Sequence, residues 1–413
     1  MDIPFQMSDM KRNNRQTIIF NIIQNRRTAS KYDIQKESRF SMSTVITTID
    51  ELLDKKFIYQ SGIGKSSGGR KPVYYSVNPQ GGYFIGIEFN VEGIHASLID
   101  LTGRAIQIYK EEIPSSKKTV SFLLERVTSI SRFISDALGE NKSHLLGVGV
   151  GAPGLVDRKK GEIVYYAHLP ECSSIPLRSL LQEVFDCPVF VDNNVNAMAY
   201  AYKSLPEMGN LDDFLLISIR SGIRMSCVLE NRVYHGFHGT AGEIGHIKVA
   251  EKGNICTCGK AGCLDAEASN QAILRKINSG LNDEYSYLQK YNDQPSQEYT
   301  LIPFIRSVQA GHPKSLELLK EVCDHISSVL AGVVNILNPK TIILSGQLTQ
   351  CGKPMLDFIK DRVIEDGFPY NTDKLEITLA EARTELGALG AAVLARELTF
   401  QPIDIPGVAL GRY

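Results

Sequence analysis

The segment from Ala241 to Ser269 constrains this chain more than any other part of the sequence. It holds three cysteines in a C-x-C-x4-C pattern, with glycines where tight turns are needed to aim three sulfur atoms at one point. A histidine ten residues upstream adds a fourth ligand, and such a closed tetrahedral shell is typical of structural zinc rather than hydrolytic zinc. We therefore predict a structural Zn²⁺ bound by His246, Cys256, Cys258 and Cys263.

Other interpretations of the cysteines are weaker. A reduced cluster without metal does not explain the ligand-like spacing, and a nucleic-acid-binding zinc finger has paired C-x2-C units. The five remaining cysteines are scattered without the spacing of a disulfide framework. No stretch approaches about eighteen consecutive apolar residues and no apolar signal core begins the chain, so we expect no membrane insertion and a cytoplasmic location.

The net charge of −1 hides an uneven distribution along the 413 residues. Residues 1–78 contain thirteen Lys or Arg and seven Asp or Glu, so this part carries +6 and the remainder carries −7. A basic head on an acidic body favours nucleic acid as a partner of the head. The chain is also long enough for two or three hydrophobic cores, so several domains are expected.

Residues 11–78 have the pattern of a winged helix-turn-helix domain. Apolar residues at helical spacing predict a first helix beginning near Lys11, a second ending near Ile34 and a third beginning after Ser41 as N-cap. The third helix places Met42, Val45, Ile49 and Leu52 on one face, and Ser43, Thr44, Thr47 and Thr48 on the other. An alternating segment with a glycine-rich, cationic tip then predicts a β-hairpin wing.

The wing decides between two interpretations of these helices. Helix patterns alone fit a small protein-binding domain equally well, but a cationic loop beside a polar helix suits DNA backbone and groove contacts. The predicted contacts to operator DNA come from the third helix and the wing tip: Ser41, Ser43, Thr44, Thr47, Lys65, Arg70 and Lys71.

After a turn-rich linker, strands and helices alternate in two successive halves. We expect one lobe over residues 82–200, completed by a final helix over 386–398, and a second lobe over 201–385 that carries the zinc segment as an insertion. The order of strands and helices in the first half is that of an actin-like ATPase lobe.

The zinc segment resembles the signature of the ROK family, which contains bacterial sugar kinases and sugar-responsive transcription repressors. The family pattern, E-x-G-H followed by C-x-C-G-x-x-G-C-[LMV]-[ED], is matched from Glu243 to Asp265. ROK repressors also have a winged head, so the resemblance covers nearly the whole chain. It implies an α/β fold with a two-lobed, actin-like sugar-kinase body of the ASKHA (ribonuclease H-like) class, ligand binding between the lobes, and a homodimer or dimer of dimers.

Three elements of the family's kinases have no match in this sequence. Residues 88–92 read E-F-N-V-E instead of D-x-G-G-T, and residues 220–226 keep one glycine of the G-T-G-x-G-G-G phosphate loop. Asn194 stands at the position of the catalytic aspartate, and an amide cannot accept the sugar's proton. Loss of a general base alone costs about 10²- to 10⁴-fold in rate, so we expect no kinase activity. Arg220 and Arg224 are expected to be surface charges, with an anionic effector as the alternative explanation.

The sugar side of the pattern is better preserved. The resemblance implies sugar contacts at Gly151, Pro153, Gly154, Asn193, Asn194, Glu243, His246 and Asp265, with Asp265 replacing the commoner Glu. Each polar residue also has a structural explanation, since Glu243 can cap a helix or pair with a cation and Asn193 can hold a turn. Together they favour a pocket for a carbohydrate or sugar phosphate effector.

The sequence therefore predicts a sugar-responsive DNA-binding regulator, most simply a repressor, with an inactive sugar-kinase body. Two other classes stay open. One is a sugar kinase with a DNA-binding head. The other is a binding module that senses a phosphorylated sugar or a phosphotransfer protein without releasing DNA.

Overall fold

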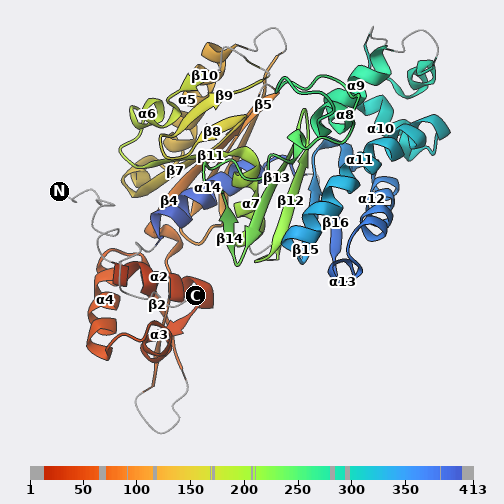
Figure 1. The fold of residues 1–413 in the computed structure, drawn as a ribbon. Coiled ribbons are helices and arrows are strands. Elements are labelled where there is room, and N and C mark those ends of the chain that lie inside the picture. The colour runs from red at the N-terminus through yellow and green to blue at the C-terminus, as the bar shows by residue number, and fades with distance from the viewer. Residues whose placement is uncertain are drawn as a thin grey trace. The chain divides into compact units, whose positions relative to one another are not determined.

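The computed structural model divides the chain into two compact units, Met1–Glu207 with Glu385–Tyr413, and Met208–Thr384 (Figure 1). The residues it describes are 14–64, 71–90, 92–114, 119–167, 169, 173–205, 208–209, 211–279, 284–293, 298–381 and 383–401.

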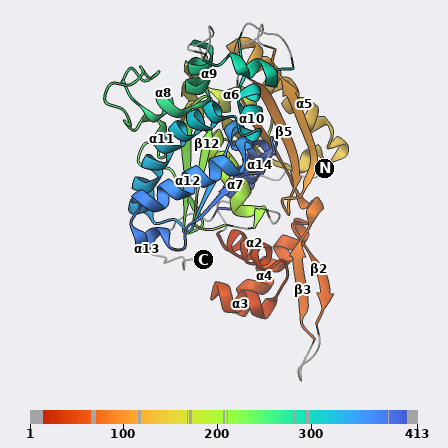
Figure 2. The same ribbon diagram turned by 90° about the vertical axis from the view of Figure 1, so that its right-hand side faces the viewer.

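In the described residues of the N-terminal head, three helices lie beside a small sheet. Strands β2 and β3 form an antiparallel hairpin beside the helices (Figure 2), and β1 pairs with the other edge of β3. Ser30 and Asp33 form a capping box that starts the second helix, which ends at Ser38 and not near Ile34 as expected. The Ser41 hydroxyl caps the third helix, as predicted. The elements are α2 (Asn14–Arg26), β1 (Ala29–Ser30), α3 (Lys31–Ser38), α4 (Met42–Asp54), β2 (Ile58–Ile63) and β3 (Val73–Val77).

Helix α4 buries one face and exposes the other. Val45, Ile49 and Leu52 are buried in the head, whereas Ser43 and Thr47 are exposed. Thr48 was assigned to the polar face, and this was wrong, since it is only 3% exposed. It lies three residues after Val45 and one before Ile49, which places it at the edge of the apolar face.

The body of the first unit is built on a mixed five-stranded sheet of order β11-β7-β4-β5-β6. Strands β4, β7 and β11 are parallel, and β4, β5 and β6 form an antiparallel meander. A separate three-stranded sheet contains β8, β9 and β10. The strands are β4 (Tyr83–Phe89), β5 (Gly93–Asp100), β6 (Ala105–Glu112), β7 (Leu145–Ala152), β8 (Leu155–Asp157), β9 (Glu162–Tyr165), β10 (Ser173–Ile175) and β11 (Val189–Asn193).

Helix α14, from the end of the chain, packs directly on this sheet. Contacts with β4, β7 and α7 are close because glycines line them. A Cβ atom at Gly149 would lie 1.8 Å from the carbonyl oxygen of Ala391, and one at Gly390 would lie 1.9 Å from that of Ala197. The helical elements of this body are η1 (Pro79–Gly81), α5 (Val120–Asp136), η3 (Gly139–His144), α6 (Leu177–Gln182), α7 (Asn194–Ser204) and α14 (Leu386–Thr399).

The second unit repeats the arrangement with a five-stranded sheet of order β14-β13-β12-β15-β16. Its strands are β12 (Phe214–Ile219), β13 (Ile223–Leu229), β14 (Arg232–Tyr234), β15 (Thr341–Ser345) and β16 (Glu376–Leu379). Its helical elements are η5 (Ile244–His246), α8 (Leu264–Ala268), α9 (Asn270–Ser279), η6 (Ser286–Tyr291), α10 (Leu301–Gln309), α11 (Pro313–Leu337), η7 (Gln347–Cys351), α12 (Lys353–Asp366) and α13 (Pro369–Thr372).

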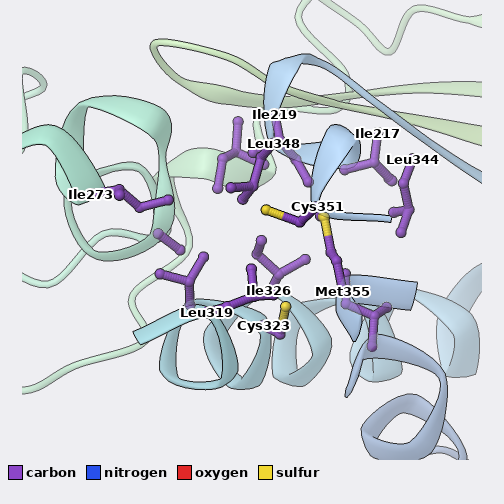
Figure 3. Close-up of a cluster of buried hydrophobic side chains, with 14 of the residues drawn as sticks. Ile217, Ile219, Ile273, Leu319, Cys323, Ile326, Leu344, Leu348, Cys351 and Met355 are labelled. Carbon is purple, nitrogen blue, oxygen red and sulfur yellow. The ribbon is translucent and has the colours of Figure 1, made fainter. Parts of the chain in front are cut away.

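The core of the second unit lies between this sheet and helices α11 and α12. Figure 3 shows Ile217 and Leu344 from the strands facing Cys323 of α11 and Met355 of α12, with Cys351 between them. Burial raises the pKa of the Cys351 thiol to about 12, so this cysteine is an uncharged core residue. Among the residues that the structure describes, no helix combines the length and apolar character needed to cross a membrane.

Candidate metal centre and ligand-binding residues

Four side chains of the second unit converge as a possible metal site. The ligand atoms of His246, Cys256, Cys258 and Cys263 all lie within 4.8 Å of one another. Cys258 Sγ is 3.7 Å from Cys263 Sγ, and Cys256 Sγ is 3.6 Å from His246 Nδ1. Two thiolates bound at about 2.3 Å in a tetrahedral shell are about 3.8 Å apart, so the group fits a tetrahedral metal ion.

Two glycines give the cysteine loop its shape. Gly259 has φ +86° and closes a turn in which its amide donates to the Cys256 carbonyl at 2.9 Å. Gly262 has φ +75°, and a Cβ atom there would lie 1.8 Å from the Ala250 carbonyl oxygen. Any other residue would therefore strain the backbone between Cys258 and Cys263.

His246 is oriented by the cysteines. Its Nδ1 faces Cys256, and it lies at the end of the short η5 helix that also carries Glu243 at its N-terminus. Binding of a metal through Nδ1 would leave Nε2 as the nitrogen available to another ligand.

Glu243 is paired with Arg224 of strand β13, and the two side chains are 33% and 14% exposed. The expectation that Arg224 is an ordinary surface charge was therefore wrong. A mostly buried guanidinium is stable here because a carboxylate neutralises it. The structural alternative for Glu243, pairing with a cation, is thus realised in this structure.

The Asp265 carboxylate accepts a hydrogen bond from the backbone of the β12–β13 turn. Its Oδ1 accepts from the Ile223 amide at 2.6 Å, at the start of β13. Gly245 makes this approach possible, since a Cβ atom there would lie 2.1 Å from the same oxygen. Asp265 therefore ties α8 to the β12–β13 turn.

In the first unit, Asn193 joins helix α7 to the loop that follows β7. Its Oδ1 accepts from the Val195 amide at 2.9 Å, and its Nδ2 donates to the Gly154 carbonyl at 2.9 Å. Asn193 is thus the N-cap of α7, so its side-chain oxygen and nitrogen both have backbone partners. Asn194 follows as the first residue of α7 and is half-buried.

Gly151, Pro153 and Gly154 lie at the end of β7, beside the start of α7. A Cβ atom at Gly151 would lie 3.2 Å from Asn194 Cα, and Gly154 has φ +74° with no room for a side chain. Pro153 is buried. The structure therefore brings five predicted sugar contacts together in the first unit and places Glu243, His246 and Asp265 in the second.

A residue that the sequence interpretation missed supports this end of α7. Asp192 is buried, accepts from the Asn193 amide at 2.7 Å and from Asn196 Nδ2 at 3.0 Å, and pairs with Arg158 at 2.7 Å. A lone aspartate in V-F-V-D-N gives no sign of this in the sequence, because its cation lies 34 positions away.

The turn after β4 is closed by a side chain. Asn90 Oδ1 accepts from the amides of Glu92 at 2.7 Å and Gly93 at 3.0 Å. Glu88, on the same strand, is buried and lies 3.3 Å from His95 Nδ1. The two amides that bind Asn90 Oδ1 are therefore already occupied within the turn.

Of the predicted DNA contacts, the described ones lie on α4 and at the base of the wing. Ser41 caps α4, accepting from the Thr44 amide at 3.2 Å, and Thr47 Oγ1 donates to the Ser43 carbonyl at 3.1 Å. Lys71 is exposed before β3, whereas Lys65 and Arg70 lie outside the described residues.

Residues 84–398 match the model of the ROK family. The chain belongs to the ROK family. It is 28% identical over 399 residues to a xylose repressor from Caldicellulosiruptor bescii, covering 95% of this chain and 98% of that protein.

Solved structures share its fold. A ROK family transcriptional regulator, described as a homologue of the Escherichia coli MLC protein, has a TM-score of 0.79 at 22% identity, covering 96% of this chain and 97% of that one. A ROK family glucokinase from Streptomyces griseus has a TM-score of 0.65 at 24% identity, covering 76% of this chain and 100% of the glucokinase. The fold is thus the α/β sugar-kinase fold of ROK proteins, preceded here by a helix-turn-helix head.

Proposed function

We propose that this chain is a sugar-responsive transcription repressor whose ROK body binds a carbohydrate without phosphorylating it. One observation carries the proposal: the xylose repressor named above matches the winged head and the body together, over nearly its whole length. A sugar kinase needs no such head, so the match favours regulation over catalysis.

The effector is a carbohydrate that contacts Gly151, Pro153, Gly154, Asn193, Asn194, Glu243, His246 and Asp265. D-xylose is the first sugar to test, because a related repressor is named for it. The ion pair of Arg224 with Glu243 places a cation beside the candidate pocket residues, so sugar phosphates form the second class to test.

The metal is Zn²⁺ in a structural role. One imidazole nitrogen and three sulfur atoms prefer zinc among the common cellular metals, and four protein ligands leave no open position for a substrate. The ion would fix the orientation of the His246 ring and stabilise the cysteine loop. His246 Nε2 could then bind a sugar hydroxyl, with the metal selecting the tautomer.

The body lacks the groups that phosphoryl transfer requires. Asn194 supplies no general base. Arg224 lies near the expected phosphate loop, but its guanidinium is paired with Glu243 and is not available to a phosphate group. We therefore expect the protein to show no sugar-dependent ATP turnover. Robust phosphorylation of any hexose or pentose would favour the kinase alternative instead.

DNA is bound by the exposed face of α4 and by the wing. Ser43, Thr44 and Thr47 suit base or phosphate contacts in the major groove, and Lys65, Arg70 and Lys71 suit the backbone or minor groove. A homodimer or dimer of dimers would present two heads to half-sites about one DNA turn apart.

The test begins with duplexes selected by the unmodified protein from a random library. Their affinity is then measured by fluorescence anisotropy with and without each of a panel of sugars and sugar phosphates. Glu243→Ala should remove the sugar response and keep DNA binding, whereas Arg70→Ala should weaken DNA binding and keep sugar binding. Failure to select any duplex, or a panel with no effect, contradicts the repressor proposal.

A further inference from the structure

One aromatic side chain from the end of the chain lies between the head and the body of the first unit. Phe400, one residue after α14, is 2% exposed. Its ring stacks on Phe20 of α2 with centroids 4.1 Å apart and planes at 16°. It also contacts Phe57 of the head edge-on at 5.9 Å and Phe84 of β4 at 6.4 Å. Phe400 thus touches both parts at once.

The backbone of Phe400 is held from two directions. Asn21 Nδ2 of α2 donates to the Phe400 carbonyl at 3.0 Å, and the Phe400 amide donates to the Arg396 carbonyl at 3.1 Å. Arg396 is itself buried against the β5–β6 turn, where a Cβ atom at Gly103 would lie 2.2 Å from its Nη1. The end of α14 is therefore fixed against α2 on one side and against the sheet on the other.

The other end of this connection is the start of α7. Helices α14 and α7 pack closely at Gly390, and Glu397 accepts from Lys203 Nζ at 2.5 Å and from the Ser204 hydroxyl. Helix α7 begins directly after Asn193, which holds the Gly154 loop. A continuous series of packed elements thus runs from the Gly154 loop through α7 and α14 to Phe400 and α2.

We propose that Phe400 is a positioning residue that transmits the state of the Asn193–Gly154 region to the DNA-binding head through α14. The proposal rests on the proposed function, in which that region contacts the sugar and α4 contacts DNA. A shift of α7 on ligand binding would move α14, and the stacked rings would carry that movement to α2, which packs on α4. An ordinary core residue would stabilise the head without this directional effect.

Hydrogen exchange of the unmodified and variant proteins tests, without any ligand, whether Phe400 stabilises the contact between α14 and α2. Phe400→Ala should speed amide exchange in α2 by about tenfold or more, because it removes the stacked ring from a buried contact. Phe400→Leu should stay close to the unmodified protein. Phe368→Ala removes a ring that is 58% exposed in the other unit and should leave α2 unchanged. Unchanged α2 exchange in Phe400→Ala, or faster exchange spread evenly over the whole chain, overturns the proposal.

The transmission is tested with a duplex selected by the unmodified protein and with D-xylose as the probe sugar. Phe400→Ala should still bind each of them, but the ratio of DNA affinities with and without xylose should approach one. Phe400→Leu should retain most of the ratio. A purely structural role would weaken binding and leave the ratio unchanged, and that result overturns the proposal. If xylose has no effect on the unmodified protein, the effector assignment fails, and the same ratio is measured with whichever sugar of the panel changes DNA affinity.

Discussion

The ion pair of Arg224 and Glu243 gives a predicted sugar-contact residue a structural partner. Glu243 belongs to the family's sugar-contact pattern, yet here its carboxylate is paired with a cation from β13. A ligand hydroxyl that binds Glu243 must share the carboxylate with Arg224 or displace it. The pair therefore contributes to the energetics of the ligand-free protein, and in the proposed function it also affects ligand binding.

Replacing Arg224 alone should be worse than replacing both partners. Arg224→Met leaves a partly buried carboxylate without its cation, and we expect a loss of about 1–3 kcal/mol in the free energy of unfolding. Arg224→Met combined with Glu243→Gln should recover most of this loss, because no charge is left unpaired. Urea denaturation of the unmodified protein, Arg224→Met, Glu243→Gln and the double variant measures the coupling free energy between the two side chains. Strict additivity of the two single changes would show that the pair contributes nothing.

Cys258 gives a prediction for the metal. Cys258→Ser should lower the zinc content from about one equivalent per chain and reduce the sugar response, because the loop beside His246 loses a ligand. Metal analysis of protein purified without added zinc measures the first effect. Cys187→Ser, which changes a cysteine far from the cluster in sequence, is the control and should retain the metal. Equal metal content and sugar response in both variants would remove the structural-zinc proposal.

At the scale of elements, α14 is held by close approaches of backbone to backbone. Gly149 on β7 and Gly390 on α14 allow approaches that no side chain could tolerate. Such close packing leaves little freedom for α14 to move independently of β7 and α7. A displacement of β7 or α7 should therefore move α14, because no flexible side chains lie between the backbones to adjust.

Two glycine substitutions separate packing from helix propensity. Gly149→Ala should destabilise the protein by about 1–3 kcal/mol or more, because the new Cβ atom collides with the Ala391 carbonyl. Gly332→Ala, at an exposed position of α11 with no atom near the new Cβ, should stabilise it by about 0.5–1 kcal/mol. Thermal unfolding measures both effects: Gly149→Ala should lower the melting temperature and Gly332→Ala should raise it. A stable Gly149→Ala protein would contradict the close packing of α14.

The elements with strong periodicity could be predicted from the sequence. The amphipathic pattern of α4 and the Ser41 cap gave the correct helix, and the final helix was expected over residues 386–398, where α14 spans Leu386–Thr399. Strand β16 and the β10 strand were missed, because four residues and three residues carry too little alternation to identify a strand.

Contacts between distant positions could not be predicted from the same pattern. Phe400 meets Asn21 across 379 positions, and no local periodicity marks either residue as a partner of the other. Arg224 was expected on the surface because one charged residue within an apolar strand carries no sign of its partner. The cysteine spacing, in contrast, indicated the group of His246 and three cysteines directly, because these four residues lie within one short segment of the sequence.

At the scale of the whole molecule, a basic head joined to a sugar-kinase-like body suggests sensing. DNA binding alone, or sugar binding alone, does not make a sugar-responsive regulator. Regulation requires the two binding events to be coupled by a free energy, typically about 1–3 kcal/mol, or roughly 5- to 150-fold in affinity. Such coupling must be reciprocal, because the binding free energies around a closed thermodynamic cycle sum to zero.

The most direct test is to measure this coupling in both directions on the unmodified protein. Affinity for a selected duplex is determined by fluorescence anisotropy with and without saturating D-xylose, and affinity for xylose is determined by calorimetry with and without the duplex. We predict that xylose lowers DNA affinity, and that the duplex lowers xylose affinity by the same factor. If the two ligands bind independently, with affinities that do not change in either direction, xylose is not the effector, and the same result for every sugar of the panel contradicts the account of this protein as a sugar-responsive repressor.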